Sequence, residues 1–207
     1  MRALVLGLAV LTITGCSVVG KSDVETAPYE VVTDTQDSRI EVRNYPHMIL
    51  VSTPMGSGEN SAFRKLFGYI SGNNVDSKDI DMTAPVIMDE GQGMEIPMTA
   101  PVFMDMNAKG GMMSFVMPDT FTAETTPAPT DENIVVHQIK DYTVAAITFN
   151  GRMSDDNVEK HRNILEKWII DNGYVVVGPV KKAGYDAPFT LPNLRRNEVL
   201  IPVEKKD

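Results

Sequence analysis

Apolar and polar residues alternate along short stretches in the first third of the chain, which predicts β-strands. The clearest case is residues 39–46, where Ile40 and Val42 share one face. Glu41 and Arg43 share the opposite face. Pro46 lacks a backbone N–H donor, so we expect it to interrupt this strand. Weaker patterns predict further strands over residues 29–33 and 48–52.

The pattern then becomes helical, with apolar residues that recur every three or four positions. Ser61 is a suitable N-cap, and Gly72 is a suitable end for the helix. The apolar stripe between them consists of Phe63, Leu66, Phe67 and Ile70. The sequence therefore predicts a helix with one buried face over about 61–71.

The second half of the chain repeats this order. A helix that begins at Ser154 or Asp155 and ends at Asn172-Gly173 follows two predicted strands, and Ile40 aligns with Ile134. The strands predicted in this half are 134–140, 142–149, 174–180 and 198–203, and 112–117 is a further strand of the first half. We predict an α+β fold of duplicated β-β-α-β units, whose strands form a curved, barrel-like sheet with one helix per unit outside. Chance similarity of two generic α+β segments is the alternative.

The N-terminus has the pattern of a secretory signal peptide. Arg2 gives a positive start, and the apolar run over 3–13 is too short to cross a bilayer. Ile13-Thr-Gly-Cys16 resembles the lipobox of bacterial lipoproteins, in which the cysteine becomes the lipidated N-terminus. We predict a signal peptide over 1–15, a lipidated Cys16 with a tether over 16–28, and one domain over 29–207. The alternative is an ordinary signal peptide with a chance cysteine.

A lipidated Cys16 predicts a location in the cell envelope. Ser17 follows it, and in a Gram-negative cell this favours the periplasmic face of the outer membrane. The net charge of −9 argues against a nucleic-acid partner and against attraction to anionic membranes. The lipid is therefore expected to be the only membrane attachment, and no protein partner is indicated. Because Cys16 is the only cysteine, no other thiol is available for a disulfide, a nucleophile or a metal.

Two motifs stand out from ordinary strand patterns. Met82-Thr-Ala-Pro-Val86 recurs at Met98-Thr-Ala-Pro-Val102, and Ala183-Gly-Tyr-Asp186 precedes Arg196-Asn-Glu-Val199. Pro85 predicts an edge strand or a bulged strand start. With residues 40–46, these motifs resemble the SOUL haem-binding family over about 29–203. Without that resemblance, two Met-rich strands packed into the core would explain the first motif equally well.

The resemblance implies a distorted barrel-like antiparallel sheet flanked by two helices, similar to the effector-binding domains of some bacterial regulators. It also implies reversible binding of haem or a free porphyrin in a hydrophobic cleft. We therefore expect a non-catalytic, membrane-anchored lipoprotein that binds haem or another tetrapyrrole as a ligand rather than as a catalytic cofactor. A structural or partner-binding lipoprotein and a small-molecule hydrolase on the related fold are the alternatives.

The first helix is the expected wall of the porphyrin slot. Phe63, Leu66 and Phe67 would contact the ring, and Arg64 or Lys65 would face a propionate. His47 is the candidate iron ligand, ahead of His137 and of a His161 expected to be solvated. A plain core stripe on the helix is the alternative for the apolar residues. Asn44 stands where some family members have a histidine, and binding without an axial ligand remains open.

Overall fold

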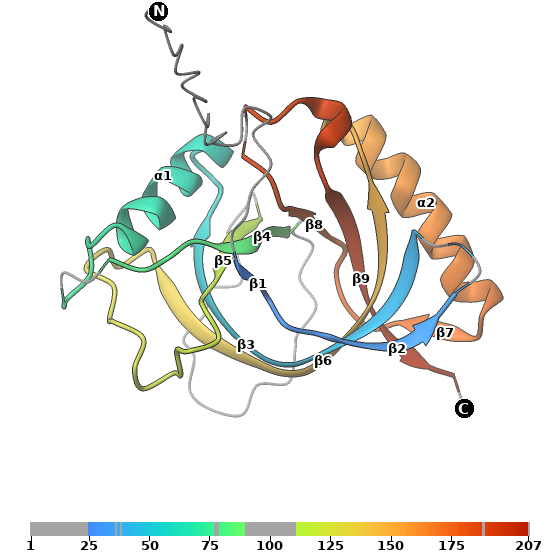
Figure 1. Ribbon diagram of the computed structural model, residues 1–207, viewed down its shortest axis with the longest axis horizontal. Coiled ribbons are helices and arrows are strands. Elements are labelled where there is room, and N and C mark those ends of the chain that lie inside the picture. Colours follow the sequence, from blue (N-terminus) through green and yellow to red (C-terminus); the bar gives the residue numbers. More distant parts are fainter. Residues whose placement is uncertain are drawn as a thin grey trace, which may run out of the picture.

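A computed structural model describes residues 25–35, 37, 39–76, 79–89, 111–187 and 189–206. Figure 1 shows one strongly curved sheet, with the two helices on opposite outer sides. The predicted signal peptide, Cys16 and the second copy of the Met-Thr-Ala-Pro motif lie outside the described residues. Neither helix of the described chain is both long and apolar enough to cross a membrane.

The sheet has the strand order β1-β4-β5-β3-β6-β9-β7, with β2 paired to β3. Strand β8 pairs with both β4 and β9, and this joins the two sides of the barrel. Only the β1–β4 pair is parallel among the strands described. The strands are β1 (Glu25–Thr26), β2 (Glu30–Asp34), β3 (Ile40–Pro54), β4 (Thr83–Asp89), β5 (Met112–Val116), β6 (Val135–Phe149), β7 (Tyr174–Val176), β8 (Lys181–Gly184) and β9 (Asn197–Lys205).

The helices α1 (Glu59–Ile70) and α2 (Asp155–Asp171) each cover part of the outer face of the sheet. Helix α2 begins after Ser154 and ends before Asn172 and Gly173, as predicted. Helix α1 begins two residues before the predicted cap Ser61, because Gly58 adopts a φ of 92° and turns the chain into the helix. A single-turn 3₁₀ helix, Pro192–Leu194, precedes β9.

Strands β3 and β6 lie side by side in the middle of the sheet, and each is one continuous strand of 15 residues. The predicted interruption at Pro46 is therefore wrong, as are the separate strands on either side of residue 47 and of Asp141. Instead, each strand continues through this point, but the face of the strand whose side chains point into the barrel switches there. Tyr45 and Met48, an odd number of residues apart, both pack inside the barrel. The ladder stays in register through this point, where Pro46 and Asp141 occupy opposing positions.

This arrangement supports the predicted duplication. Pro46 is the seventh residue of β3, Asp141 is the seventh residue of β6, and each strand is followed by a helix. The result is the predicted α+β fold of repeated units around a barrel-like sheet. Three apolar clusters stabilise it, one inside the barrel and one beneath each helix.

Two further predictions, one on the Met-Thr-Ala-Pro motif and one on the tether, can be compared with the strands. Strand β4 begins at Thr83 of the first Met-Thr-Ala-Pro copy, and its pairing with β5 shifts register between Thr83 and Val86, in agreement with the expected irregular strand start. Residues 25–28 were assigned to the tether, yet Glu25 and Thr26 pair with β4, and the amide of Ala27 donates to Ala84. The folded part of the chain therefore includes the end of that segment.

Candidate functional site

An apolar shelf lies beside α1 on the outer face of the sheet. Helix α1 packs on β3 and β5, while β4 lies one strand further out. The side chains of Val86 and Met88 on β4, together with Met82, are only partly buried at the border of the cluster beneath α1. We call these three residues, with Phe63 and Phe67 of the helix, the α1 shelf.

The two phenylalanines form the helical wall of the α1 shelf. Their rings stack with centroids 6.1 Å apart and an interplanar angle of 12°. Phe63 also contacts the ring of the core residue Phe115 edge-on at 5.3 Å, which ties it to the cluster below. Phe67 remains 49% exposed. A large aromatic face held in place but open to solvent is typical of a binding surface.

A cation lies at the far side of the shelf. Lys182 on β8 pairs with Met88 of β4, and its Nζ lies 3.1 Å from a carboxylate oxygen of Glu59 at the start of α1. Lys182 is almost completely buried, whereas the side chain of Glu59 is mostly exposed. The pair thus spans from β8 to the first turn of α1 and places a buried ammonium group close to apolar surface.

The structure separates the residues that the sequence assigned to one slot. Phe63 and Phe67 lie together on the α1 shelf, but Leu66 is fully buried beneath the helix, so its assignment to a slot wall is wrong. Arg64 lies on another flank of α1. There it lines a separate cleft of about 470 Å³ together with Lys65, Gly68, Tyr69, Asn73, Thr130, Asp131 and Ile134.

None of the three histidines has a described contact with the α1 shelf. His47 lies on β3 opposite Lys140. His137 is largely buried, its Nδ1 has no hydrogen-bond partner among the described residues, and burial followed by the charge of Lys181 lowers its pKa to about 4. His161 is buried, not solvated as predicted. Its ring stacks on Phe149 at 4.3 Å, and its Nδ1 lies 2.7 Å from the carbonyl oxygen of Asn157.

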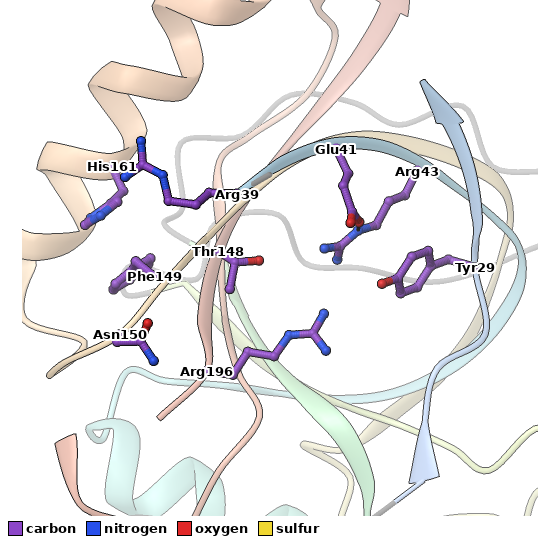
Figure 2. A pocket seen from close by; sticks show the side chains of 9 residues that line it. All are labelled: Tyr29, Arg39, Glu41, Arg43, Thr148, Phe149, Asn150, His161 and Arg196. Carbon is purple, nitrogen blue, oxygen red and sulfur yellow. Dashed lines mark hydrogen bonds and ion pairs between the residues drawn. The ribbon is translucent and has the colours of Figure 1, made fainter. Parts of the chain in front are cut away.

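A second, polar cleft of about 510 Å³ lies near α2, and Figure 2 shows its lining. Side chains from β3, β6, α2 and the segment just before β9 surround it. Tyr29, Arg43 and Arg196 point toward one another across the curve of the sheet. We call this the arginine cleft, and its lining residues are Tyr29, Arg39, Glu41, Arg43, Thr148, Phe149, Asn150, His161 and Arg196.

A fully buried carboxylate, Glu198 on β9, lies beneath the arginine cleft. Arg43 donates to both of its oxygens at 2.7 and 3.0 Å, and Arg196 donates to one of them at 3.0 and 2.6 Å. The hydroxyl of Tyr185 donates at 2.7 Å and that of Thr148 at 3.2 Å. Burial by itself would raise the pKa of Glu198, but the bonds and charges of Arg43 and Arg196 outweigh it, so this pKa lies below its usual value.

The tyrosines beside this carboxylate extend the network. The guanidinium of Arg43 lies 4.4 Å from the ring centre of Tyr29, and that of Arg196 lies 4.1 Å from the ring centre of Tyr185. Burial and the neighbouring carboxylate raise the pKa of Tyr185. At neutral pH the network therefore consists of a carboxylate, two guanidinium groups and a neutral phenol.

The sequence contained this network only as separate signals. The motifs around Tyr185 and Glu198 were noted as features of the family. Glu41 and Arg43 were placed on the face opposite Ile40, and that face proves to be the barrel interior. An arginine and a glutamate in a short apolar segment, as in Arg196-Asn-Glu-Val199, could have indicated a buried charge. The partner of Glu198, however, is Arg43, which is 155 residues away.

Comparison with known structures supports the fold. The C-terminal domain of EcmrR is 16% identical with a TM-score of 0.53, over 86% of this chain and 98% of that chain. The EcmrR–DNA complex is 15% identical with a TM-score of 0.56, over 80% and 57%. A structure described as a hydrolase from Listeria innocua is 12% identical with a TM-score of 0.54, over 80% and 92%. At these identities the likeness concerns the fold alone.

No curated protein matches the chain at a significant level. A family model does match, in two segments that together span nearly all the described residues. The segments are 24–93 and 88–202, and the model describes the SOUL heme-binding protein. The chain, with its Met-Thr-Ala-Pro-Val strand and its Arg43–Glu198 barrel interior, belongs to the SOUL haem-binding family.

Proposed function

We propose that this protein binds haem or another tetrapyrrole on the α1 shelf and does not transform it. Membership of the SOUL family supports haem binding in general. The main evidence for this location is the half-exposed ring of Phe67. It stacks on Phe63 beside the partly buried side chains of β4.

The residues of the shelf fit such a ligand. A tetrapyrrole is a large flat apolar ring with carboxylates at one edge, so it needs an apolar surface and a cation. Phenylalanine faces stack on flat rings, and the flexible side chains of Met82 and Met88 adapt to their outline. Lys182, which pairs with Met88 between β8 and β4, supplies the cation, and a ligand carboxylate would compete with Glu59 for it.

Iron ligation contributes little to this proposal. None of the three histidines has a described contact with the shelf, and the described residues contain no group of three or more His, Cys, Asp or Glu side chains suited to a metal ion. A methionine thioether is a weaker donor than imidazole. We therefore expect the ring to supply most of the binding energy, so that haemin and a metal-free porphyrin bind with similar affinity.

The network at Glu198 argues against the hydrolase alternative. A carboxylate acts as a general base when a lone pair is free to accept a proton and its pKa is near the working pH. Glu198 accepts six hydrogen bonds, and its pKa is lowered. Both features suit a structural carboxylate rather than a catalytic one.

The proposal includes anchoring in the cell envelope through Cys16. The lipobox-like sequence supports it, and the charge of −9 supports the absence of a nucleic-acid partner. Cys16→Ala should move the protein from the membrane fraction to the supernatant and abolish labelling by a radioactive fatty acid. A variant that stays in the membrane fraction would contradict lipid anchoring.

A titration tests the ligand and its location together. Haemin and protoporphyrin are added to the mature chain carrying Cys16→Ser, while the Soret band and the fluorescence of Trp168 are followed. Both should bind with a 1:1 endpoint, and Phe67→Ser should weaken both by about tenfold, as expected for loss of one stacked aromatic face. Ile170→Ser removes another exposed apolar side chain, 74% exposed, from α2 and is the matched control.

The outcomes separate the alternatives. Absence of binding by the mature chain that carries only Cys16→Ser leaves the structural or partner-binding function. Binding that Phe67→Ser leaves unchanged places the ligand elsewhere. Binding of haemin alone, lost on His47→Ala, would show that iron ligation dominates.

A further inference from the structure

The arginine cleft contains more hydrogen-bond donors than its carboxylates can accept. Glu198 already accepts six hydrogen bonds, whereas a carboxylate offers about four lone-pair positions. Glu41, the only other carboxylate among the described residues of the cleft wall, accepts one bond from Arg43 at 2.7 Å. The cleft is thus suited to a ligand that accepts hydrogen bonds.

Two of the three arginines reach solvent. The side chains of Arg39 and Arg196 are 52% and 39% exposed, whereas that of Arg43 is 2% exposed. Asp37 pairs with Arg39, so Asp37, Glu41 and Glu198 together balance the three arginines in formal charge. Attraction for an anion therefore comes from directed N–H groups rather than from net charge, and a small inorganic anion should bind weakly.

The loop between β8 and β9 adds an apolar surface beside this cleft. Phe189 is 79% exposed, Leu191 is 55% exposed and Leu194 is 38% exposed. Three large apolar side chains exposed on one short loop commonly mark a binding surface.

This loop is bonded to the cleft wall. Asn150, a lining residue, donates to the carbonyl oxygens of Asn193 and Arg195 at 3.4 and 3.0 Å. The amide of Gly151 donates to the carbonyl oxygen of Pro192 at 2.8 Å. The loop that carries these apolar side chains is therefore hydrogen-bonded to the rim of the arginine cleft.

We propose that the arginine cleft and the 189–194 loop form a binding site for an anionic amphiphile. The carboxylate or phosphate head accepts hydrogen bonds from Arg39 and Arg196, and the hydrocarbon part covers Phe189, Leu191 and Leu194. The cleft volume of about 510 Å³ lies within the range of small-ligand sites. This site is separate from the α1 shelf and does not depend on tetrapyrrole binding. The ligand could be a free amphiphile or the headgroup of an anionic lipid in a bilayer.

Calorimetric titration of the mature chain carrying Cys16→Ser tests the chemistry. Laurate and dodecyl phosphate, below their micelle concentrations, should bind at one site. Inorganic phosphate should bind at least about a hundredfold more weakly, because it lacks the hydrocarbon part. Dodecyltrimethylammonium has the same chain with the opposite charge, and equal binding of this cation would overturn the proposal.

Substitutions test the location. Arg39→Gln and Leu191→Ser change exposed side chains and should each weaken laurate binding by about tenfold. Val175→Ser changes an exposed apolar residue on β7 and should leave laurate affinity unchanged. All three variants should retain wild-type porphyrin binding, which distinguishes failure of this site from failure of the α1 shelf. Unchanged laurate binding in both Arg39→Gln and Leu191→Ser would refute the proposed site.

Vesicle flotation distinguishes the two sources of the ligand. If the chain floats with vesicles of phosphatidylcholine and phosphatidylglycerol, and Leu191→Ser reduces the floating fraction, a bilayer headgroup is the ligand. If the chain binds laurate but does not float, the ligand is a free amphiphile. A chain that binds neither laurate nor vesicles overturns the inference.

Discussion

The guanidinium of Arg43 on β3 donates two hydrogen bonds to the carboxylate of Glu198 on β9, at 2.7 and 3.0 Å. Strand β6 runs between these strands, so the pair connects them across a third strand of the barrel. Arg43 belongs to the first repeated unit and Glu198 to the second. The pair therefore links the two halves of the duplicated fold inside the barrel.

The two partners should not be equally costly to replace. Glu198→Met leaves Glu41 as the one described carboxylate paired with the buried guanidinium of Arg43, and we expect a loss of about 3–5 kcal/mol in the free energy of unfolding. Arg43→Met leaves Glu198 with Arg196 and Tyr185, so its loss should be smaller. Urea unfolding of both single variants and the double variant gives their coupling, which should be about 1–3 kcal/mol. A larger loss in Arg43→Met than in Glu198→Met would contradict this account.

Adjacent residues of β3 should respond in opposite directions. The hydroxyl of Ser52 lies 2.7 Å from that of Ser114, and both are buried, so Ser52→Ala should cost about 1 kcal/mol. The hydroxyl of Thr53 is buried without a hydrogen-bond partner among the described residues. Thr53→Val should therefore be neutral or stabilising by up to about 1 kcal/mol. Chemical denaturation of the two variants provides the check, and a marked loss in Thr53→Val would show that this hydroxyl has a partner.

Neighbouring residues of α1 should separate stability from binding. Leu66 is fully buried, so Leu66→Ala should cost about 2–5 kcal/mol. Phe67 is half exposed and contributes mainly its stacking on Phe63, so Phe67→Ala should cost no more than about 1 kcal/mol. Thermal unfolding measures the first effect, and porphyrin titration should show the larger loss of affinity in Phe67→Ala. Comparable stability losses would place Phe67 in the core.

Stability should depend on pH through His137. Burial, and then the charge of Lys181, lowers its pKa from 6.5 to about 4 in the folded protein. Between these values the unfolded chain binds a proton that the folded chain does not, so stability falls as the pH decreases from 6.5 to 4. The shift corresponds to about 3 kcal/mol at most.

Urea unfolding at pH 7.0, 5.5 and 4.5 measures this dependence, and His137→Leu should flatten it. Glu198 acts in a lower range. Its pKa is lowered on folding, so its contribution is present above about pH 4.5 and is lost as the pH falls further. A decrease in stability between pH 7.0 and 5.5 that His137→Leu leaves unchanged would assign the dependence to another group.

Local patterns predicted the presence of helices and strands better than the residues at which they begin and end. The helix after Ser154 was predicted closely because its cap, stripe and terminal glycine lie within one short segment. The break at Pro46 was wrong because β3 stays paired with β6 through this point, and the opposing residue Asp141 is 95 positions away in the sequence. The sequence also did not show that Leu66 is buried, since a helical stripe does not show which of its members remains exposed.

The sequence by itself determined the two helices, the strand pattern that precedes each of them, the duplication, the SOUL motifs and a lipobox-like N-terminus. These features depend on residues close together in the chain, whose spacing and chemistry act locally. Only the tertiary structure decided that Arg43 and Glu198 meet inside the barrel, that Arg64 and Phe67 lie on different flanks of α1, and that the 189–194 loop borders a polar cleft. Each of these relationships depends on the curvature of the sheet and on the register of its strands, because these bring together side chains that are distant in sequence.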